Sequence, residues 1–187
     1  MAIADQTTPT RSLEERLTEL EARIAELESA QPEDKLSMVV FSGDLDRVLA
    51  AFVIATGAGA MGQKVDMFFT FWGLTALKER TDLKGKTFFQ KMMGLMTPDS
   101  SETLPVSRMN YFGVGAKMLR TMMKQKNVES LEDLMQLARD LGVNIIACDM
   151  SQGVMGIADH ELIDNLEHGG VGTFLGSALT AKTSLFI

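Results

Sequence analysis

A single cysteine, Cys148, is present among the 187 residues of the chain. One thiol excludes an intramolecular disulfide, a Cys-x-x-Cys redox pair and a cysteine-rich zinc site. Free thiols persist in a reducing compartment, and the N-terminal residues are polar and acidic rather than an apolar signal peptide. The sequence therefore predicts a cytoplasmic protein.

The sequence also lacks an apolar run long enough for a membrane span. The longest such run, residues 48–62, covers about fifteen residues, whereas a spanning helix needs roughly 20. Its many alanines and glycines suit a helix packed closely against a sheet. Membrane insertion is therefore not expected.

Positive charge is outnumbered by negative charge, with 18 Lys and Arg against 25 Asp and Glu and a net charge of -7. The acidic excess is concentrated in residues 1–34, and the remainder is nearly neutral. A nucleic-acid groove requires clustered basic residues, so no nucleic-acid partner is expected. The densest basic cluster has helical spacing and is interpreted as a solvated helix face, with docking of an acidic partner as the alternative; it comprises Lys117, Arg120, Lys124 and Lys126.

Metal ligands are sparse. The only histidines, His160 and His168, are separated by a spacing that fits no standard metal site, so we expect them to face solvent, with a role as proton partner of Cys148 left open. The 14 methionines favour core filling over a copper(I) site. The sequence predicts neither a metal nor a cofactor.

The segment Gly57-Ala-Gly59-Ala-Met-Gly62 matches the dinucleotide-binding pattern G-x-G-x-x-G. In that fingerprint the glycines follow a strand and open a helix, which places phosphate at the helix N-terminus. Here they close a predicted helix and precede a strand. We therefore interpret them as a helix stop with close packing against a sheet.

Residues 1–11 show no pattern and are predicted to be disordered. Ser12 and Glu15 then form a capping box, and a heptad seam follows, made of Leu13, Leu17, Leu20, Ile24 and Leu27. We expect the helix to self-associate through residues 13–27, with docking on its own domain as the alternative. It ends in a linker that reaches residue 34.

Residues 35–187 predict a doubly wound α/β domain, with a mostly parallel sheet of about five strands and helices on both faces. Apolar runs predict strands at 35–42, 64–72, 143–148 and 184–187. Helices are predicted at 45–61, 74–79, 88–96, 116–126, 130–141, 157–163 and 170–181. Ser42 or Asp44 is expected to cap the first of these, and the Met-rich stretch within residues 80–116 is expected to form a lid or a subunit contact.

Cys148 ends a predicted central strand, at the edge of an α/β sheet where ligands and reactive groups collect. Position alone leaves open whether the thiol reacts or only packs.

Four segments together resemble the DsrE/DsrF/DsrH-like sulfur-relay family, in particular the branch described as DsrE-like or peroxiredoxin-like. They are KLSMVVFSGDLDRVLAAFVIATGAGAMG, VDMFFTFWGL, LARDLGVNIIACDMSQGVMGI and GGVGTFLGSAL followed by SLFI. The resemblance covers residues 35–187 and implies a doubly wound subunit that assembles into trimers or hexamers. It also implies a cysteine that takes sulfane sulfur as a persulfide and passes it to a small TusA-like carrier, and the matching residue is Cys148.

Two functions from different classes follow. In the first, Cys148 carries persulfide sulfur between a donor and a TusA-like acceptor, in a pocket shaped by Ser42, Gly43 and Asp44 and by the loop with Met150, Ser151 and Gly153. In the second, the protein is an oligomeric ligand-binding or scaffold module in which the cysteine only packs. The sequence leaves open whether the first would amount to a sulfurtransferase-like enzyme.

Overall fold

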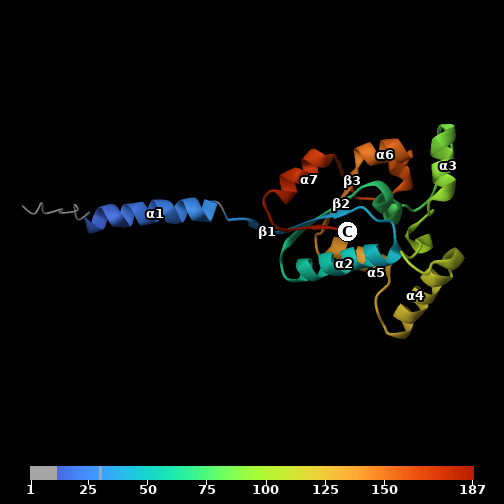
Figure 1. The fold of residues 1–187 in the computed structure, drawn as a ribbon, viewed down its shortest axis with the longest axis horizontal. Coiled ribbons are helices and arrows are strands. Elements are labelled where there is room, and N and C mark those ends of the chain that lie inside the picture. The colour runs from blue at the N-terminus through green and yellow to red at the C-terminus, as the bar shows by residue number, and fades with distance from the viewer. Residues whose placement is uncertain (1–11, 30) are drawn as a thin grey trace, which may run out of the picture. The chain divides into compact units, whose positions relative to one another are not determined.

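The structure is a computed structural model that describes residues 12–29 and 31–187 (Figure 1). The chain divides into two units, residues 1–32 and 33–187, each of which is described by itself. The disorder predicted for residues 1–11 lies outside the described residues. Within the described residues, no helix has the length and apolarity to cross a bilayer.

The N-terminal unit contains one helix, α1 (Leu13–Ser29). The predicted capping box is present: the Glu15 amide donates to the Ser12 hydroxyl at 3.2 Å, and the Glu15 carboxylate accepts from the Ser12 amide at 3.1 Å. The helix therefore begins where the local sequence indicates. All five seam side chains, Leu13, Leu17, Leu20, Ile24 and Leu27, are exposed.

The second unit is built on a five-stranded, fully parallel sheet in the order β4-β3-β2-β1-β5. Its strands are β1 (Glu33–Val40), β2 (Lys64–Phe69), β3 (Asn144–Cys148), β4 (Glu167–Gly169) and β5 (Ala181–Phe186). The chain moves outward from β1 through β2 and β3 to β4, then returns to place β5 on the free side of β1. The predicted α/β class is confirmed.

Six α-helices of this unit surround the sheet: α2 (Leu45–Ala60), α3 (Phe88–Met96), α4 (Val114–Gln125), α5 (Leu131–Asp140), α6 (Asp149–Met155) and α7 (Val171–Ala178). Short 3-10 helices span Phe71–Leu77, Ser101–Thr103, Tyr111–Gly113 and Asp159–Glu161. Figure 1 shows α2 and α5 on one side of the sheet and α7 on the other. The sheet is thus covered on both faces, as predicted.

Alternating strand residues create two cores of unequal size. The larger lies under α2 and α5 and receives, from the strands, Met38, Met67, Ile145 and Ala147 among others. The smaller lies on the opposite face, under Phe174 of α7, and consists of Val39, Phe68, Ile146 and Cys148. The single thiol therefore belongs to the thinner side of the sheet.

Several predicted boundaries are wrong where tertiary contacts override local pattern. β2 ends at Phe69 rather than residue 72, because Phe71 has a φ of 47° and starts a 3-10 helix that replaces the one predicted at 74–79. The helix predicted at 157–163 is reduced to the turn Asp159–Glu161, because the flanking amides are bonded elsewhere: Ile163 donates to the Leu77 carbonyl, and Ala158 donates to the Glu161 carboxylate. β4 was not predicted, because the three residues Glu167–Gly169 show no alternation of apolar and polar side chains.

The predicted loop 150–153 is instead part of α6, with Ser151, Gln152 and Met155 buried. Asp44 stands at the N-cap of α2 as predicted but makes no side-chain cap; its carboxylate accepts from the Ser42 hydroxyl at 3.0 Å. Arg120 is not on a solvated face, because its guanidinium donates to the Ser101 carbonyl at 2.7 Å.

Candidate functional site

Cys148 is the last residue of β3 and the N-cap of α6. Its side chain is 2 % exposed and lies in the small core with Val39, Phe68 and Ile146. β3 pairs with β2 on one side and with β4 on the other. The thiol is therefore held at the carboxyl edge of the sheet, where the sequence placed it, but beneath the surface.

Hydrogen bonds govern the acidity of this thiol. Burial in the small core opposes ionisation, but donors from the Ser151 side chain and amide, the Thr70 hydroxyl and the Met150 amide outweigh it. The net effect lowers the pKa of Cys148 below its ordinary value. A thiol with a lowered pKa presents more of the nucleophilic thiolate at neutral pH.

The two hydroxyls around the thiol also bind each other: Thr70 Oγ1 and Ser151 Oγ are 2.8 Å apart, and both residues are buried. Thr70 directly follows β2, and Ser151 lies in the first turn of α6. Thr70 was missed in the sequence, although it stands at the end of the strand that precedes the Cys148 strand in chain order. No local signal marked it, because the predicted strand ran to residue 72, and only the earlier end of β2 at Phe69 places Thr70 at the same edge as Cys148.

The predicted pocket residues near α6 divide into two groups. Ser151 and the Met150 amide are among the groups that lower the pKa of the Cys148 thiol, whereas the Met150 side chain is exposed. Gly153 is also exposed, and its carbonyl accepts from the side-chain Nε2 of Gln90 at 3.4 Å. Gly153 therefore faces α3.

The turn of Ser42, Gly43 and Asp44 lies beside a separate hollow. This cavity, of about 280 Å³, is also lined by Phe41, Arg47, Trp72, Thr75, Pro98 and Pro105. It lies beyond the end of β1, two strands from β3, which corresponds to roughly 10 Å across the sheet. Cys148 is not among its lining residues in the described chain.

Both histidines contact polar side chains. His168 Nδ1 lies 3.1 Å from Gln152 Oε1 and 3.6 Å from Asp149 Oδ1. His168 pairs with Ala147 in the sheet register, while Cys148 pairs with Gly169, so the His168 side chain leaves the sheet on the face opposite to the thiol. His160 Nε2 lies 3.3 Å from the Asp82 carboxylate.

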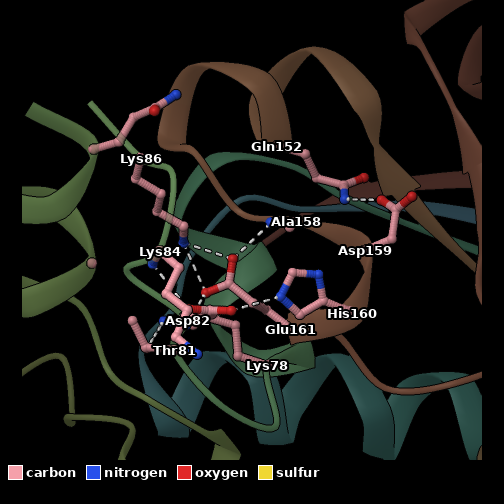
Figure 2. A network of polar contacts seen from close by, with 12 residues as sticks. Lys78, Thr81, Asp82, Lys84, Lys86, Gln152, Ala158, Asp159, His160 and Glu161 are labelled. Carbon is pink, nitrogen blue, oxygen red and sulfur yellow. Dashed lines mark hydrogen bonds and ion pairs between the residues drawn. The ribbon is translucent and has the colours of Figure 1, made fainter.

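A buried carboxylate, Glu161, is the second polar centre of the domain and was not predicted (Figure 2). Its side chain is 0 % exposed, and its two oxygens accept from Lys86 Nζ at 2.8 and 2.6 Å. The amides of Asp82 and Ala158 donate to it at 2.6 and 2.7 Å. Burial opposes ionisation of Glu161, but these donors together lower its pKa.

The same network includes a second buried amine. Lys78, which is 2 % exposed, donates to the Thr81 hydroxyl at 2.7 Å and to the Pro98 carbonyl at 2.9 Å. Burial is the main cause that lowers its pKa, although the nearby Glu161 opposes this shift. The network thus joins the chain after the Phe71–Leu77 turn to the chain after α6 (Figure 2). These two segments follow, in the chain, the elements that carry Thr70 and Ser151.

The predicted absence of a nucleotide role for the glycine motif agrees with its geometry. At Gly59 a Cβ would lie 3.2 Å from the Leu141 Cβ, so this glycine packs where α5 ends rather than on the sheet. Gly62 has a φ of 80° and follows the end of α2. Among residues 12–29 and 31–187 there is no cluster of three or more His, Cys, Asp or Glu side chains able to hold a metal ion.

Comparison with known proteins agrees with this fold. Residues 32–186 match the model of the DsrE/DsrF/DrsH-like family. An uncharacterised protein of Bacillus subtilis, YrkE, is 39 % identical over 154 residues, which cover 82 % of this chain and 96 % of that protein. Sulfur carrier protein DsrE2 of Allochromatium vinosum is 31 % identical over 159 residues, covering 82 % of this chain and 98 % of that protein.

Among solved structures, the crystal structure of the ychN protein from E. coli matches with a TM-score of 0.45 and 12 % identity, covering 81 % of this chain and 99 % of that one. The family model spans the whole α/β unit, from the residue before β1 to the last residue of β5. On the sequence match over residues 32–186, the chain belongs to the DsrE/DsrF/DrsH-like family.

Proposed function

We propose that this protein is a sulfur carrier that holds sulfane sulfur as a persulfide on Cys148. The observation that carries the proposal is the position of Cys148, which lies at the carboxyl edge of the sheet where β3 ends and α6 begins. The nearby groups of Thr70, Met150 and Ser151 lower the pKa of its thiol. The 31 % identity to a protein named as a sulfur carrier supports the same assignment.

The chemistry follows the route of thiol–disulfide exchange. The Cys148 thiolate attacks the outer sulfur of a donor persulfide, R–S–SH. The new S–S bond forms on Cys148 as the donor S–S bond breaks, and the donor leaves as a thiolate. The sulfur atom moves with no net oxidation or reduction, so the step needs no cofactor. The donors around Cys148 stabilise the attacking thiolate and later the same group as it leaves.

Another protein's thiol or a small acceptor must take the sulfur, because the chain has no other cysteine to form an internal disulfide. The acceptor is a thiolate on a small TusA-like carrier protein, which attacks the outer sulfur of the Cys148 persulfide and regenerates the free thiol. This sulfurtransferase-like exchange requires reduced thiols, which places it in the cytoplasm. Docking occurs at the carboxyl edge of the sheet, between the turn of Ser42, Gly43 and Asp44 and the α6 segment with Met150 and Gly153.

The protein acts as a homo-oligomer, either a trimer or a hexamer of its α/β domain or a pair joined through residues 13–27. Exposed apolar side chains support a contact between domains: Val171 and Leu175 of α7 and Leu179 at its C-cap lie on the surface, and Ser177 is the one buried residue of this helix. A surface of this kind is typical of a subunit contact.

The test is transfer of sulfur measured by intact mass. After incubation with a low-molecular-weight persulfide donor, the protein should gain about 32 Da per sulfur atom, and this gain should be lost on reduction. The Cys148→Ser variant should gain nothing. Cys148 that alkylates readily yet takes up no sulfur would overturn the carrier function.

A second function is favoured by one observation, the 2 % exposure of Cys148 within the small core. In this case the protein is an oligomeric ligand-binding or scaffold module, and the thiol is a packing group. A folded protein whose Cys148 resists iodoacetamide for hours, while the unfolded protein reacts at once, would support the scaffold and contradict the carrier.

A further inference from the structure

The N-terminal helix α1 lies outside the segment that matches the family, which begins at residue 32. Its seam residues Leu13, Leu17, Leu20, Ile24 and Leu27 have exposed fractions from 53 % to 79 %. An apolar stripe of two to three heptads left in solvent is unfavourable, and a helix of 17 residues is marginally stable when alone. The stripe therefore requires an occupant.

The heptad register assigns each residue a position. Spacings of four, three, four and three place Leu13, Leu20 and Leu27 at d, and Leu17 and Ile24 at a. Leucine occupies every d position, and both a positions are aliphatic, with the β-branched Ile24 at one of them. This combination favours a coil of two helices over one of three or four.

The flanking charges then determine the orientation. Both g positions are arginine, Arg16 and Arg23, and the e positions 14, 21 and 28 are glutamate in the sequence. In a parallel pair, each g residue meets the e residue five positions later on the partner helix, so Arg16 meets Glu21 of a second copy. In an antiparallel pair, g meets g and e meets e, which sets arginine against arginine and glutamate against glutamate.

We propose that α1 forms a parallel, two-stranded coiled coil with α1 of a second copy of this chain. The charge pattern of Arg16, Arg23 and Glu21 is complementary to itself only in this orientation. A parallel coil places the C-terminal ends of both helices together, and the linker to β1 is short, since α1 ends at Ser29 and β1 begins at Glu33. Two α/β domains, each with one Cys148, are therefore joined at the same end of the coil.

Disulfide trapping tests the orientation in the full-length protein. In a Cys148→Ser background, Leu13→Cys and Leu27→Cys each introduce one thiol at a d position. In a parallel dimer each variant faces its own copy and should be oxidised to a covalent dimer in high yield. In an antiparallel dimer the core layers pair a positions with d positions, so residue 13 faces residue 24 of the partner, and only a mixture of Leu13→Cys with Ile24→Cys would form the dimer.

A matched control is Ala22→Cys, at the outward f position of the same exposed helix, which should give little covalent dimer. Three outcomes would overturn the proposal: disulfide capture only in the mixture, equal capture at position 22, and no capture at positions 13 and 27. A helix that docks on its own domain would give the last of these.

Charge reversal gives an independent readout. Arg16→Glu with Arg23→Glu places glutamate opposite glutamate in the parallel pair and should weaken dimerisation on the order of tenfold, an effect that decreases with salt. Adding Glu14→Arg, Glu21→Arg and Glu28→Arg should restore the affinity, because the pairs are recreated with exchanged signs. Failure of this restoration in sedimentation measurements would contradict the e–g pairing.

Discussion

At the scale of single residues, the reactivity of Cys148 depends on hydrogen-bond donors rather than on a nearby base. The cost of charging a thiol inside a core is offset by the amides of Met150 and Ser151 and by the Thr70–Ser151 hydroxyl pair, in which one proton joins the two oxygens and the other is free to donate. Histidine, which activates many catalytic cysteines, is absent from this shell: His168 leaves the sheet on the other face. Such a thiol is suited to exchange with a partner persulfide, which requires a thiolate but no general base.

The first prediction concerns Thr70. In the wild-type protein the rate of Cys148 alkylation should rise with pH through a midpoint that lies below the ordinary pKa of cysteine. Thr70→Val removes a donor to the thiolate, so the midpoint should move upward and the rate at pH 7 should fall. Thr56→Val is the matched control, because Thr56 is a buried threonine that donates to the Phe52 carbonyl in α2. An unchanged midpoint in Thr70→Val would show that Thr70 does not stabilise the thiolate.

At the scale of elements, α7 covers the small core that contains the thiol. It is held by the Ser177 hydroxyl, which donates to the Asp66 carboxylate, and by Phe174, whose ring centroid is 5.5 Å from that of Phe68. Other apolar side chains of α7 face solvent. An element with few buried contacts opens more readily than the sheet beneath it, so movement of α7 gives a reagent access to Cys148.

The second prediction follows from that cover. Phe174→Ala should accelerate alkylation of Cys148 roughly tenfold, because about 1.4 kcal/mol lost from the closed state multiplies the open population tenfold. Val53→Ala, at an exposed apolar residue of α2 on the other side of the sheet, should leave the rate unchanged. Equal rates in Phe174→Ala and wild type, measured under native conditions, would mean that α7 does not limit access.

Local signals predicted some elements well. The capping boxes at Ser12 and Ser130 begin α1 and α5, since both bonds in each box lie within four residues. α6 and β4 were missed for the opposite reason. α6 is bonded to Gln90 of α3 and to the Thr70 hydroxyl, and β4 pairs with the edge of β3. Each of these partners is remote in sequence from the element that it holds.

At the scale of the whole α/β domain, the buried pair of Glu161 and Lys86 joins segments 75 residues apart. Removing one partner leaves the other charged and desolvated. Lys86→Met should therefore lower the free energy of unfolding by about 3 kcal/mol in urea titrations. Lys84→Met, at an exposed lysine two residues away, should change it by at most about 0.5 kcal/mol. Similar losses in the two variants would contradict a structural role for the pair.

The same pair predicts an acid dependence of stability. Folding lowers the pKa of Glu161. Its contribution to the free energy of unfolding is therefore fully present above the unfolded glutamate pKa of about 4.3, and it is lost as pH falls through the lower pKa of the folded state. The wild-type free energy of unfolding should therefore decrease more steeply on acidification than that of the Glu161→Gln, Lys86→Met double variant. Parallel curves for the two proteins would exclude Glu161 as the titrating group.

Sequence alone determined the features that depend on short-range pattern. The heptads of α1, the buried strands, the α/β class and the position of Cys148 at a strand end follow from periodicity and from local capping, which need no knowledge of distant partners. The tertiary structure decided which groups surround the thiol. Thr70 and Ser151 are 81 residues apart in the chain and meet only because β2 and β3 are parallel neighbours. Burial of Glu161 likewise depends on donors from residues 82 and 86, and no local pattern encodes a contact of that range.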